Sequence, residues 1–236
     1  MLPTSTPGEP VPGIETRDLS AWAGPDFRAA LRLRLVAEDT VAWANGFRAS
    51  EAFAPGVRTV FALDTPRGAV GVPDEVLDHQ GGARALRATA LHNTLTREQP
   101  DACIAIRPDP KDNLPLGSFL QLAGRSHYVA SLALDLVGRA RAVGVEPGPD
   151  GLFFAVPSRN LLLLHAIRDA ACQDSMNALA VRAIRAFQQV PGTITPNAFW
   201  WRDGRIEAIS RYVDGQQVWS VPDDLYDILE RYSGSG

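Results

Sequence analysis

Two Asp-Gly pairs near the C-terminal end constrain the fold of this chain more than any other feature of its sequence. The stretch NAFWWRDGRIEAISRYVDGQQVWSV places Asp203-Gly204 and Asp214-Gly215 between aromatic and aliphatic runs. Asp-Gly readily supplies the left-handed residues of a tight turn between antiparallel strands, so it is the strongest local signal for a β-hairpin. We predict a three-stranded β meander here, followed by a short helix over residues 222–232.

The remainder of the chain alternates between helical and strand patterns. We therefore predict an α+β fold with mixed helices and mostly antiparallel strands. The spacing of four between Phe27, Leu31 and Leu35 predicts a helix over residues 27–47. The run VRTVFALD at residues 57–64 predicts a buried strand that ends in a turn. Further predicted strands cover residues 69–72, 102–107 and 118–122, and further predicted helices cover residues 83–98, 126–143 and 173–189.

Composition divides the chain into a leader and two lobes. Residues 1–25 contain several prolines, which is typical of a flexible leader. The turn-rich segment PDPKDNLP marks a boundary between an N-terminal lobe over residues 26–110 and a C-terminal lobe over residues 111–236. A chain of 236 residues is long enough for two small lobes with a shared core, so we expect one compact unit.

The charge distribution argues against a nucleic-acid partner. The formal charge is −4 at pH 7, whereas nucleic-acid-binding domains normally carry a basic surplus. A local cluster of Arg28, Arg32 and Arg34 is predicted to be the solvated face of a helix.

Other features of the sequence indicate where in the cell the protein is located. The longest apolar runs fall far short of the ~20 residues that a membrane span requires. The start, MLPTSTPGEPVPG, lacks the charged and apolar regions of a signal peptide. Cys103 and Cys172 form neither a CxxC motif nor a recognisable metal-ligand spacing. Because Arg also far outnumbers Lys, we expect a bacterial cytoplasmic protein with no metal, no cofactor and no membrane contact.

The stretch FFAVPSRNLLLL places polar residues between two apolar runs. Pro157 has no amide hydrogen for a sheet, so we predict that it ends a buried strand. Ser158 then either caps a helix or precedes a second buried strand, because periodicity cannot separate the two over residues 161–167. In both cases the Arg159 guanidinium needs an acid, a group of carbonyls or a bound anion.

Polar residues four apart mark the predicted helix over residues 126–143. His127, Ser131, Asp135 and Arg139 would form one stripe along it. A catalytic triad requires the His between the Ser and the Asp, whereas here Ser131 lies between the other two. We interpret the stripe as structural or solvated, with a binding surface as the alternative.

Two further residues are candidates for a site. Asn93 lies on the apolar face of the helix over residues 83–98, where a buried amide must be hydrogen-bonded. Asp64 ends a predicted buried strand, which is compatible with a functional residue and with a plain turn former.

The segments VRTVFALDTPRGAVGVPDEVL, ALRATALHNTL, HYVASLALDL, GLFFAVPSRNLLLL and PGTITPNAFWWRDGRI follow one another along residues 55–207. Their order resembles that of the YtpQ-like family of bacterial proteins, a family of unknown function. The family pattern has Arg at the position of Leu132, Asp at the position of Asn160, and Ser-Pro where Thr195-Pro196 stands. The resemblance implies a bacterial intracellular α+β domain. It implies no reaction, cofactor or catalytic residue.

Two classes of function remain. The first is a non-enzymatic binding protein, regulatory or of the immunity type, that acts through a protein partner. No recognisable catalytic set is present, and Trp200, Trp201 and Trp219 gather in the predicted meander. Adjacent Trp200 and Trp201 on a strand face opposite sides, so one indole can lie exposed at an interface. Burial of both would remove the main support for this class.

The second class is an enzyme or small-ligand-binding protein. Its site would combine Asp64, Asn93, Ser131 and Arg159, with Arg159 holding an anionic group. This hypothesis fails if the four side chains are scattered over different faces of the molecule.

Overall fold

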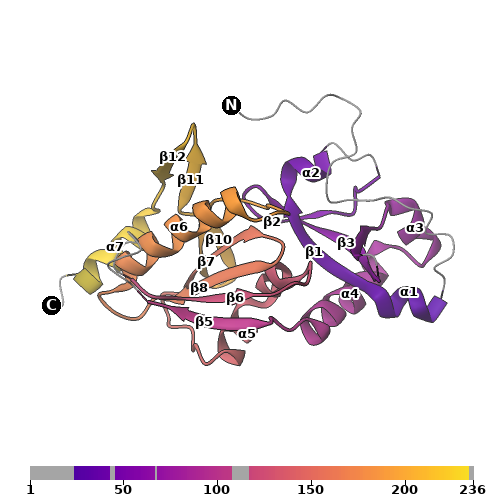
Figure 1. The fold of residues 1–236 in the computed structure, drawn as a ribbon, viewed down its shortest axis with the longest axis horizontal. Helices are drawn as coiled ribbons and strands as arrows, with labels where there is room; N and C mark the ends of the chain where they lie inside the picture. Colours follow the sequence, from indigo (N-terminus) through magenta and orange to yellow (C-terminus); the bar gives the residue numbers. More distant parts are fainter. Residues whose placement is uncertain (1–23, 43–45, 67, 108–116, 234–236) are drawn as a thin grey trace.

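The described part of the chain folds into two larger antiparallel sheets that lie side by side along the long axis of the molecule, with a separate two-stranded hairpin (Figure 1). The computed structural model describes residues 24–42, 46–66, 68–107 and 117–233. Within them the predicted α+β class is confirmed, with seven α-helices and only antiparallel strand pairs. The leader, apart from its last two residues, and the whole predicted boundary segment lie outside the described residues, so the division into lobes stays a prediction.

The first sheet, called sheet A, is formed by four strands. The predicted strand at residues 57–64 is confirmed as the central strand β3, and the predicted hairpin partner at residues 69–72 is confirmed as β4. The order is β1-β3-β2, with β4 also paired to β3. The strands are β1 (Leu31–Ala37), β2 (Glu51–Ala54), β3 (Val57–Thr65) and β4 (Gly68–Gly71).

The predicted helix over residues 27–47 is wrong. Helix α1 (Gly24–Ala30) ends before Leu31, strand β1 follows, and α2 (Glu38–Ala42) is a short helix after it. A spacing of four fits one face of a helix, but it also fits one face of a strand because four is a multiple of two. In the folded protein the Leu-Arg-Leu-Arg-Leu segment follows the two-residue alternation of a strand.

Both faces of sheet A are covered. Leu31, Leu33 and Phe61 on one face pack against α1 and two further helices, α3 (Asp74–His79) and α4 (Ala83–Arg97). The predicted helix over residues 83–98 is thereby confirmed. On the opposite face, Val36 and Val60 form a small cluster with Val41 and Phe47.

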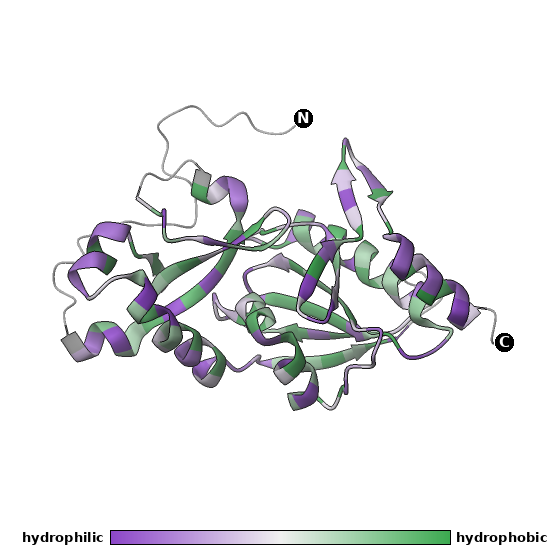
Figure 2. Cartoon of the chain, turned by 180° about the vertical axis from the view of Figure 1, so that it is seen from behind, coloured by the Kyte–Doolittle hydropathy of each residue, from purple (hydrophilic) through white to green (hydrophobic). Residues whose placement is uncertain are grey.

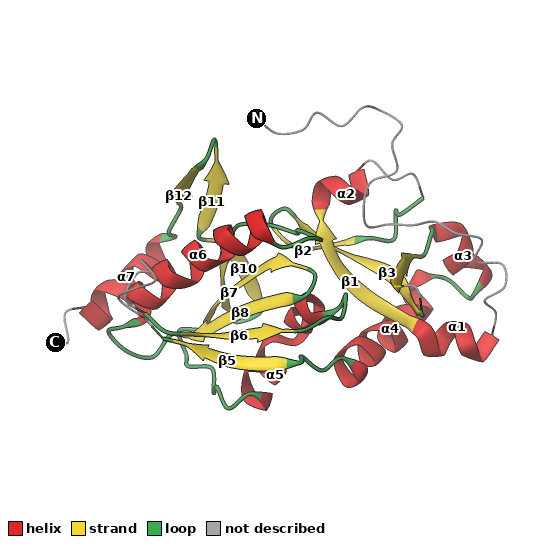
Figure 3. Cartoon of the chain, in the orientation of Figure 1, coloured by secondary structure: helices red, strands yellow, loops and turns green. Residues whose placement is uncertain are grey.

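The second sheet, called sheet B, has six strands in the order β10-β9-β7-β8-β6-β5, all antiparallel (Figure 3). The strands predicted at residues 102–107 and 118–122 are confirmed as its edge strand β5 and its neighbour β6. The strands are β5 (Ala102–Ile106), β6 (Phe119–Ala123), β7 (Leu152–Ser158), β8 (Leu161–Ala166), β9 (Ala198–Arg202) and β10 (Arg205–Ala208).

Helices bury both faces of sheet B, which explains the uninterrupted leucine run. Leu161 and Leu163 belong to the core that includes helix α6 (Cys172–Gln189). Leu162 and Leu164 belong to the core on the other face, under a 3-10 helix, η2 (Val129–Asp135), and α5 (Leu136–Ala142). Figure 2 shows the central strands of this sheet as mostly hydrophobic. The second core also includes Leu35 of β1, so it joins the two sheets.

The stretch FFAVPSRNLLLL is a β-hairpin. Strand β7 continues through Pro157 to Ser158, so Pro157 does not end it, and residues 161–166 form strand β8. The register shifts between Ala155 and Ser158, and such an irregularity accommodates a residue that has no amide hydrogen. Ser158 caps no helix; its hydroxyl donates to Oδ1 of Asn160 at 2.7 Å across the turn.

The predicted helix over residues 126–143 is broken in two. The segment forms η2 and then α5, and a carboxylate oxygen of Asp135 accepts a hydrogen bond from the amide of Gly138 at the start of α5. A 3-10 helix has three residues per turn instead of 3.6, so His127, Ser131 and Arg139 do not share one stripe. Ser131 is fully buried rather than solvated.

Both Asp-Gly hairpin turns are confirmed. Asp203 and Asp214 have φ of 49° and 50°, and each is followed by a glycine at 81°. The meander nevertheless consists of two hairpins rather than three strands, because buried Ile209 separates β10 from β11 (Ser210–Val213) and β12 (Gln216–Trp219). The β11–β12 hairpin projects from the body (Figure 3), and helix α7 (Asp223–Ser233) follows it.

Candidate functional site

Strand β1 is an edge strand of sheet A, and polar side chains of neighbouring helices occupy its free edge. The amide of Leu33 donates to Oγ1 of Thr94 on α4 at 2.8 Å. The amide of Leu35 donates to Oγ of Ser131 on η2 at 3.0 Å. An exposed strand edge can pair with other chains, and these two hydroxyls prevent that by satisfying its amides.

Asn93 belongs to the same edge. Its Nδ2 donates to the carbonyl oxygens of Leu31 at 3.0 Å and Arg28 at 2.8 Å. The prediction that a buried Asn93 must be hydrogen-bonded is confirmed. Asn93 and Ser131 therefore lie in one region, but both side chains bond to the backbone rather than face a ligand.

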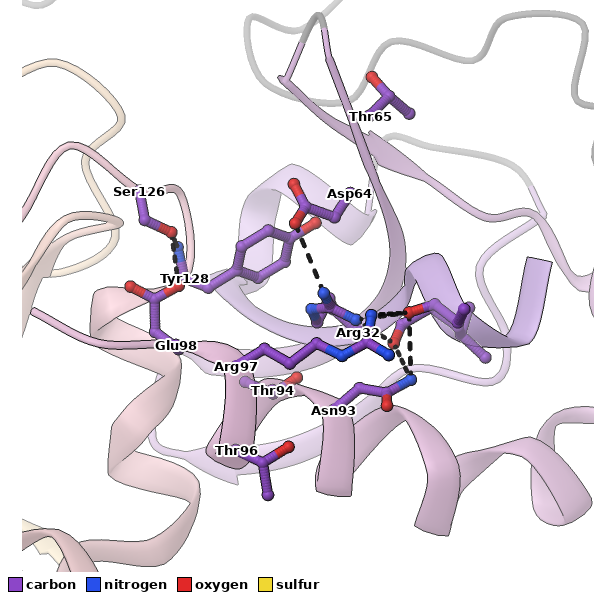
Figure 4. Close-up of polar contacts among 12 residues, drawn as sticks. Arg32, Asp64, Thr65, Asn93, Thr94, Thr96, Arg97, Glu98, Ser126 and Tyr128 are labelled. Carbon is purple, nitrogen blue, oxygen red and sulfur yellow. Dashed lines mark hydrogen bonds and ion pairs between the residues drawn. The ribbon is translucent and has the colours of Figure 1, made fainter. Parts of the chain in front are cut away.

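Asp64 lies on β3 next to β1, where it forms an ion pair with Arg32 (Figure 4). The distance from Arg32 Nη2 to Asp64 Oδ2 is 3.6 Å. The Arg32 side chain is buried, whereas 49% of the Asp64 side chain is exposed. Burial lowers the pKa of Arg32, and Asp64 partly offsets this effect by stabilising its positive charge.

The predicted solvated face of Arg28, Arg32 and Arg34 is wrong for two of the three. Arg32 and Arg34 are each only 6% exposed, and they lie on the same face of β1 because they are two residues apart in a strand. Arg28 is exposed on α1. The period-two pattern LRLRL could have identified a strand with both arginines on one face, but not the burial of that face.

Tyr128 covers this face of β1. Its side chain is buried and points toward Asp64 and Arg32 in Figure 4, and its hydroxyl has no hydrogen-bond partner among the described residues. Burial is the main cause that raises the pKa of Tyr128, and the nearby carboxylate of Asp64 raises it further. Tyr128 is therefore a neutral phenol whose hydroxyl is free to donate a hydrogen bond.

A buried acid lies beside Tyr128. Oε2 of Glu98 accepts a hydrogen bond of 2.6 Å from the hydroxyl of Ser126, while its Oε1 has no partner among the described residues (Figure 4). Burial raises the pKa of Glu98, and the hydrogen bond from Ser126 opposes this effect only in part. Sequence reasoning missed Glu98 because it lies just after the C-terminal end of α4, where an acid is usually solvated.

Arg159 occupies the turn between β7 and β8. Its amide donates to the carbonyl of Gly192 at 2.8 Å, and its carbonyl accepts from the amide of Ala130 at 3.1 Å. Its guanidinium forms no ion pair or hydrogen bond with any residue in the described part of the chain. Burial is the main cause that lowers the pKa of both Arg34 and His127, and the positive charge of Arg159 lowers both further.

His127 completes this group of charges. Its imidazole packs against β4, where a Cβ on Gly68 would lie 3.6 Å from Nε2. Burial is the main cause that lowers the pKa of His127, followed by the positive charges of Arg159 and Arg34, while Asp64 opposes them. We use the term seam cluster for six residues of β1, β3, the turn before η2 and the β7–β8 turn whose charges influence one another's pKa, namely Arg32, Arg34, Asp64, His127, Tyr128 and Arg159.

The four predicted ligand-site residues fall into two groups, and within the described residues no hydrogen bond or ion pair joins one group to the other. Asp64 and Arg159 belong to the seam cluster, whereas Asn93 and Ser131 close the free edge of β1.

The two adjacent tryptophans face opposite sides of sheet B, as alternation along a strand requires. Trp200 is buried on the α6 side, and its Nε1 donates to the carbonyl of Asp150 at 2.9 Å. Trp201 is half-buried against the core on the other side. Neither indole is fully exposed, but Trp219 on β12 is 38% exposed.

The comparisons with known proteins identify no relative: no family model, no curated protein and no solved structure matches the chain. Among the described residues, no three His, Cys, Asp or Glu side chains gather in a group that could hold a metal ion. No helix within the described ranges is long and apolar enough to cross a membrane.

Proposed function

We propose that the protein is a non-enzymatic binding protein, regulatory or of the immunity type, that acts through a protein partner. The observation that supports this proposal is the position of the exposed hydrophobic side chains. Of the five large ones in the described part of the chain, four lie on the β11–β12 hairpin and α7. Exposed apolar side chains that gather on neighbouring elements are typical of interaction sites, and here Val213 and Val218 share one face of the hairpin while Trp219 lies on the other.

The docking surface comprises these four residues, whose exposed fractions range from 38% to 55%. The hairpin carries three of them and projects away from sheet B, so a partner can contact both of its sides (Figure 1). Trp is favoured among the residues that contribute most to protein interfaces. The docking surface consists of Val213, Val218, Trp219 and Tyr226.

A hollow lies beside the docking surface. It has a volume of about 380 Å³ and is lined by Trp219 and Tyr226 together with Met176 of α6 and Leu229 of α7. A hollow of this size can hold one large apolar side chain of a partner. We therefore place the anchoring residue of the partner there.

The chemistry of the partner follows from the charges around the hollow. Helix α7 exposes a row of acids, of which Glu230 lines the hollow itself. A partner with basic residues around an apolar anchor would complement this row and associate faster at low salt. The row consists of Asp223, Asp224, Asp227 and Glu230.

Contacts of Asp150 hold α7 in place. Its Oδ1 lies 3.4 Å from Nη2 of Arg231, and its Oδ2 accepts a hydrogen bond of 3.0 Å from the hydroxyl of Tyr232. Asp150 also bonds to Trp200 through its carbonyl, so α7 and sheet B share one anchor. A surface fixed in this way loses little conformational entropy when it binds.

The test is affinity purification from the native host with four baits, namely the wild type and three variants, followed by identification of the captured proteins. The wild-type protein and Ile104→Ser should retain the same partner, since Ile104 is the fifth exposed hydrophobic residue and lies on the edge strand β5. Trp219→Ser should reduce capture by at least about tenfold, as loss of an interface anchor does. Asp227→Lys should weaken capture further as salt decreases.

Equal capture by the wild type and Trp219→Ser would overturn this surface assignment, provided that circular dichroism shows the variant to be folded. Capture of a metabolite in place of a protein would favour the second candidate function, a small-ligand-binding protein. The unpaired Arg159 guanidinium supports that candidate.

We further propose that the protein belongs to the YtpQ-like family and acts in the bacterial cytoplasm. The ordered segments over residues 55–207 support the family. Because that family has no known function, membership would leave the choice between the two candidates to the experiment above.

A further inference from the structure

Strand β5 lies at the outer edge of sheet B, and within the described residues only β6 pairs with it (Figure 3). In the same part of the chain, no backbone hydrogen bond reaches residues 102–106 from any element other than β6. A strand edge carries a row of amide and carbonyl groups that can pair with a strand of another chain. The free side of β5 therefore offers hydrogen-bonding groups to a further strand.

Strand β5 lacks the features that usually protect a sheet edge, which are charged residues, proline, a β-bulge or a covering segment. Its sequence, ACIAI, contains no charge and no proline, and its five pairs with β6 run without a register shift. Two other strand edges are protected. Thr94 and Ser131 satisfy amides of β1, while β10 carries Arg205 and Glu207 and lies beside β2. The composition of β5 is that of a strand with neighbours on both sides.

The side chains of β5 are exposed on both faces of the sheet. Cys103 and Ala105 point to one face and Ile104 to the other, because side chains alternate along a strand. Ile104 is 48% exposed and lies outside the docking surface, so the protein-binding proposal does not account for it. Ile106, on the same face as Ile104, already packs against the core that includes α6. A strand beside β5 would extend this apolar face over Ile104.

The residues that flank β5 have opposite charges. Asp101 precedes the strand, Arg107 follows it, and both are exposed. Arg107 forms no ion pair within the described residues, and the side chain of Asp101 stays 54% exposed although it pairs with Arg125. If two copies of this segment run antiparallel with Ile104 opposite Ile104, each Asp101 lies opposite an Arg107. Because opposite charges at facing positions stabilise a strand pair, this edge is complementary to itself.

We propose that β5 pairs with β5 of a second copy of this chain about a twofold axis at Ile104, so that sheet B continues from one copy into the other. In this register all five residues of the strand take part, and both pairs of opposite charge form. A register centred on Cys103 or Ala105 has fewer strand pairs and places the flanking charges opposite neutral residues. This proposal goes beyond the protein-binding function, because it concerns β5 rather than the β11–β12 hairpin and α7.

Sedimentation velocity over a range of protein concentrations tests the pairing. Two five-residue strands bury less surface than the ~1,600 Å² of a standard protein interface, so we expect a weak dimer with a dissociation constant of about 1–100 μM. The wild type should change from monomer to dimer as its concentration increases to about 1 mM. A protein that remains monomeric over this whole range would overturn the proposal.

A charge on the strand edge should prevent the pairing. Ile104→Lys places two lysines opposite each other and should raise the dissociation constant of the dimer by about tenfold or more. The matched control is Val218→Lys on β12, because Val218 is 49% exposed and lies outside β5. This control should dimerise as the wild type does. Equal dimerisation of Ile104→Lys and the wild type, with both folded by circular dichroism, would show that β5 is not the interface.

Charge variants test the register. Arg107→Asp alone places acids opposite acids at both ends of the strand pair, and Asp101→Arg alone places arginines opposite arginines. Each variant should therefore dimerise about threefold to tenfold more weakly than the wild type. An equimolar mixture of the two should dimerise more tightly than either alone, because the acids of one copy then face the arginines of the other. A misfolded variant would not be rescued in this way, and a mixture no tighter than its two components would contradict the proposed register.

Discussion

Oγ of Ser131 accepts a hydrogen bond of 3.0 Å from the amide of Leu35, across 96 positions of sequence. This bond joins η2, which covers sheet B, to the edge strand of sheet A. Leu35 itself belongs to the core under η2, so polar and apolar contacts join the sheets at the same place.

Ser131→Ala should therefore destabilise the protein. The change leaves the buried amide of Leu35 without an acceptor, which costs about 1–3 kcal/mol of the free energy of unfolding. Urea denaturation measures this loss. The control is Ser220→Ala at an exposed position, which should change stability by less than about 0.5 kcal/mol. Similar values for the two variants would contradict the role of the bond.

Asn93→Leu should also destabilise the protein, by about 1–3 kcal/mol, because the carbonyls of Leu31 and Arg28 lose their donor. Leu branches at Cγ as Asn does but has no hydrogen-bonding group, so the variant removes these hydrogen bonds. Hydrogen exchange should become faster at the amides of Leu33 and Leu35, since β1 frays from α4. Unchanged exchange at these two amides would show that Asn93 does not hold the edge.

Glu98→Gln should change how stability depends on pH. Burial raises the pKa of Glu98, so the folded protein holds this proton more tightly than the unfolded chain does. The wild type should therefore lose stability as pH rises from about 4.3, the ordinary value for Glu, through the raised pKa. Glu98→Gln should not show this loss, because Gln stays neutral and still accepts from Ser126.

The measurement is the free energy of unfolding of both proteins over the same pH series. The stability of the variant relative to the wild type should increase with pH over that window and then level off. Glu75→Gln makes the same chemical change at an exposed position and serves as the control. A difference that decreases with pH would have the wrong sign for a raised pKa.

Trp200→Phe should destabilise the protein more than Trp201→Phe. Trp200 is buried and donates to the carbonyl of Asp150 at 2.9 Å, so its loss combines a missing hydrogen bond with a small void. We expect a cost of about 1–3 kcal/mol for Trp200→Phe. Half-buried Trp201 makes no side-chain hydrogen bond within the described residues, so its replacement should cost less. Thermal or urea unfolding of the two variants gives the comparison.

Local sequence determined the elements whose signals do not depend on distant contacts. The Asp-Gly turns need only two residues that adopt positive φ, and both turns formed where they were predicted, although the three-stranded meander did not. The helices α4, α6 and α7 were also predicted, because apolar residues recur along each with helical spacing between clear end signals.

Only the tertiary structure decided the secondary structure of the remaining segments and the arrangement of the charged residues. The LRLRLV run and the leucines at residues 161–164 fit more than one kind of element, and burial against helices on the faces of the two sheets made both of them strands. The seam cluster was even less accessible to sequence reasoning. Arg34, His127 and Arg159 are far apart in the chain, and their segments are brought together by the contacts of η2 with the β7–β8 turn and with the edge of β1. Charge and burial at such a point are properties of the packing, because no short stretch of sequence contains all the groups that meet there.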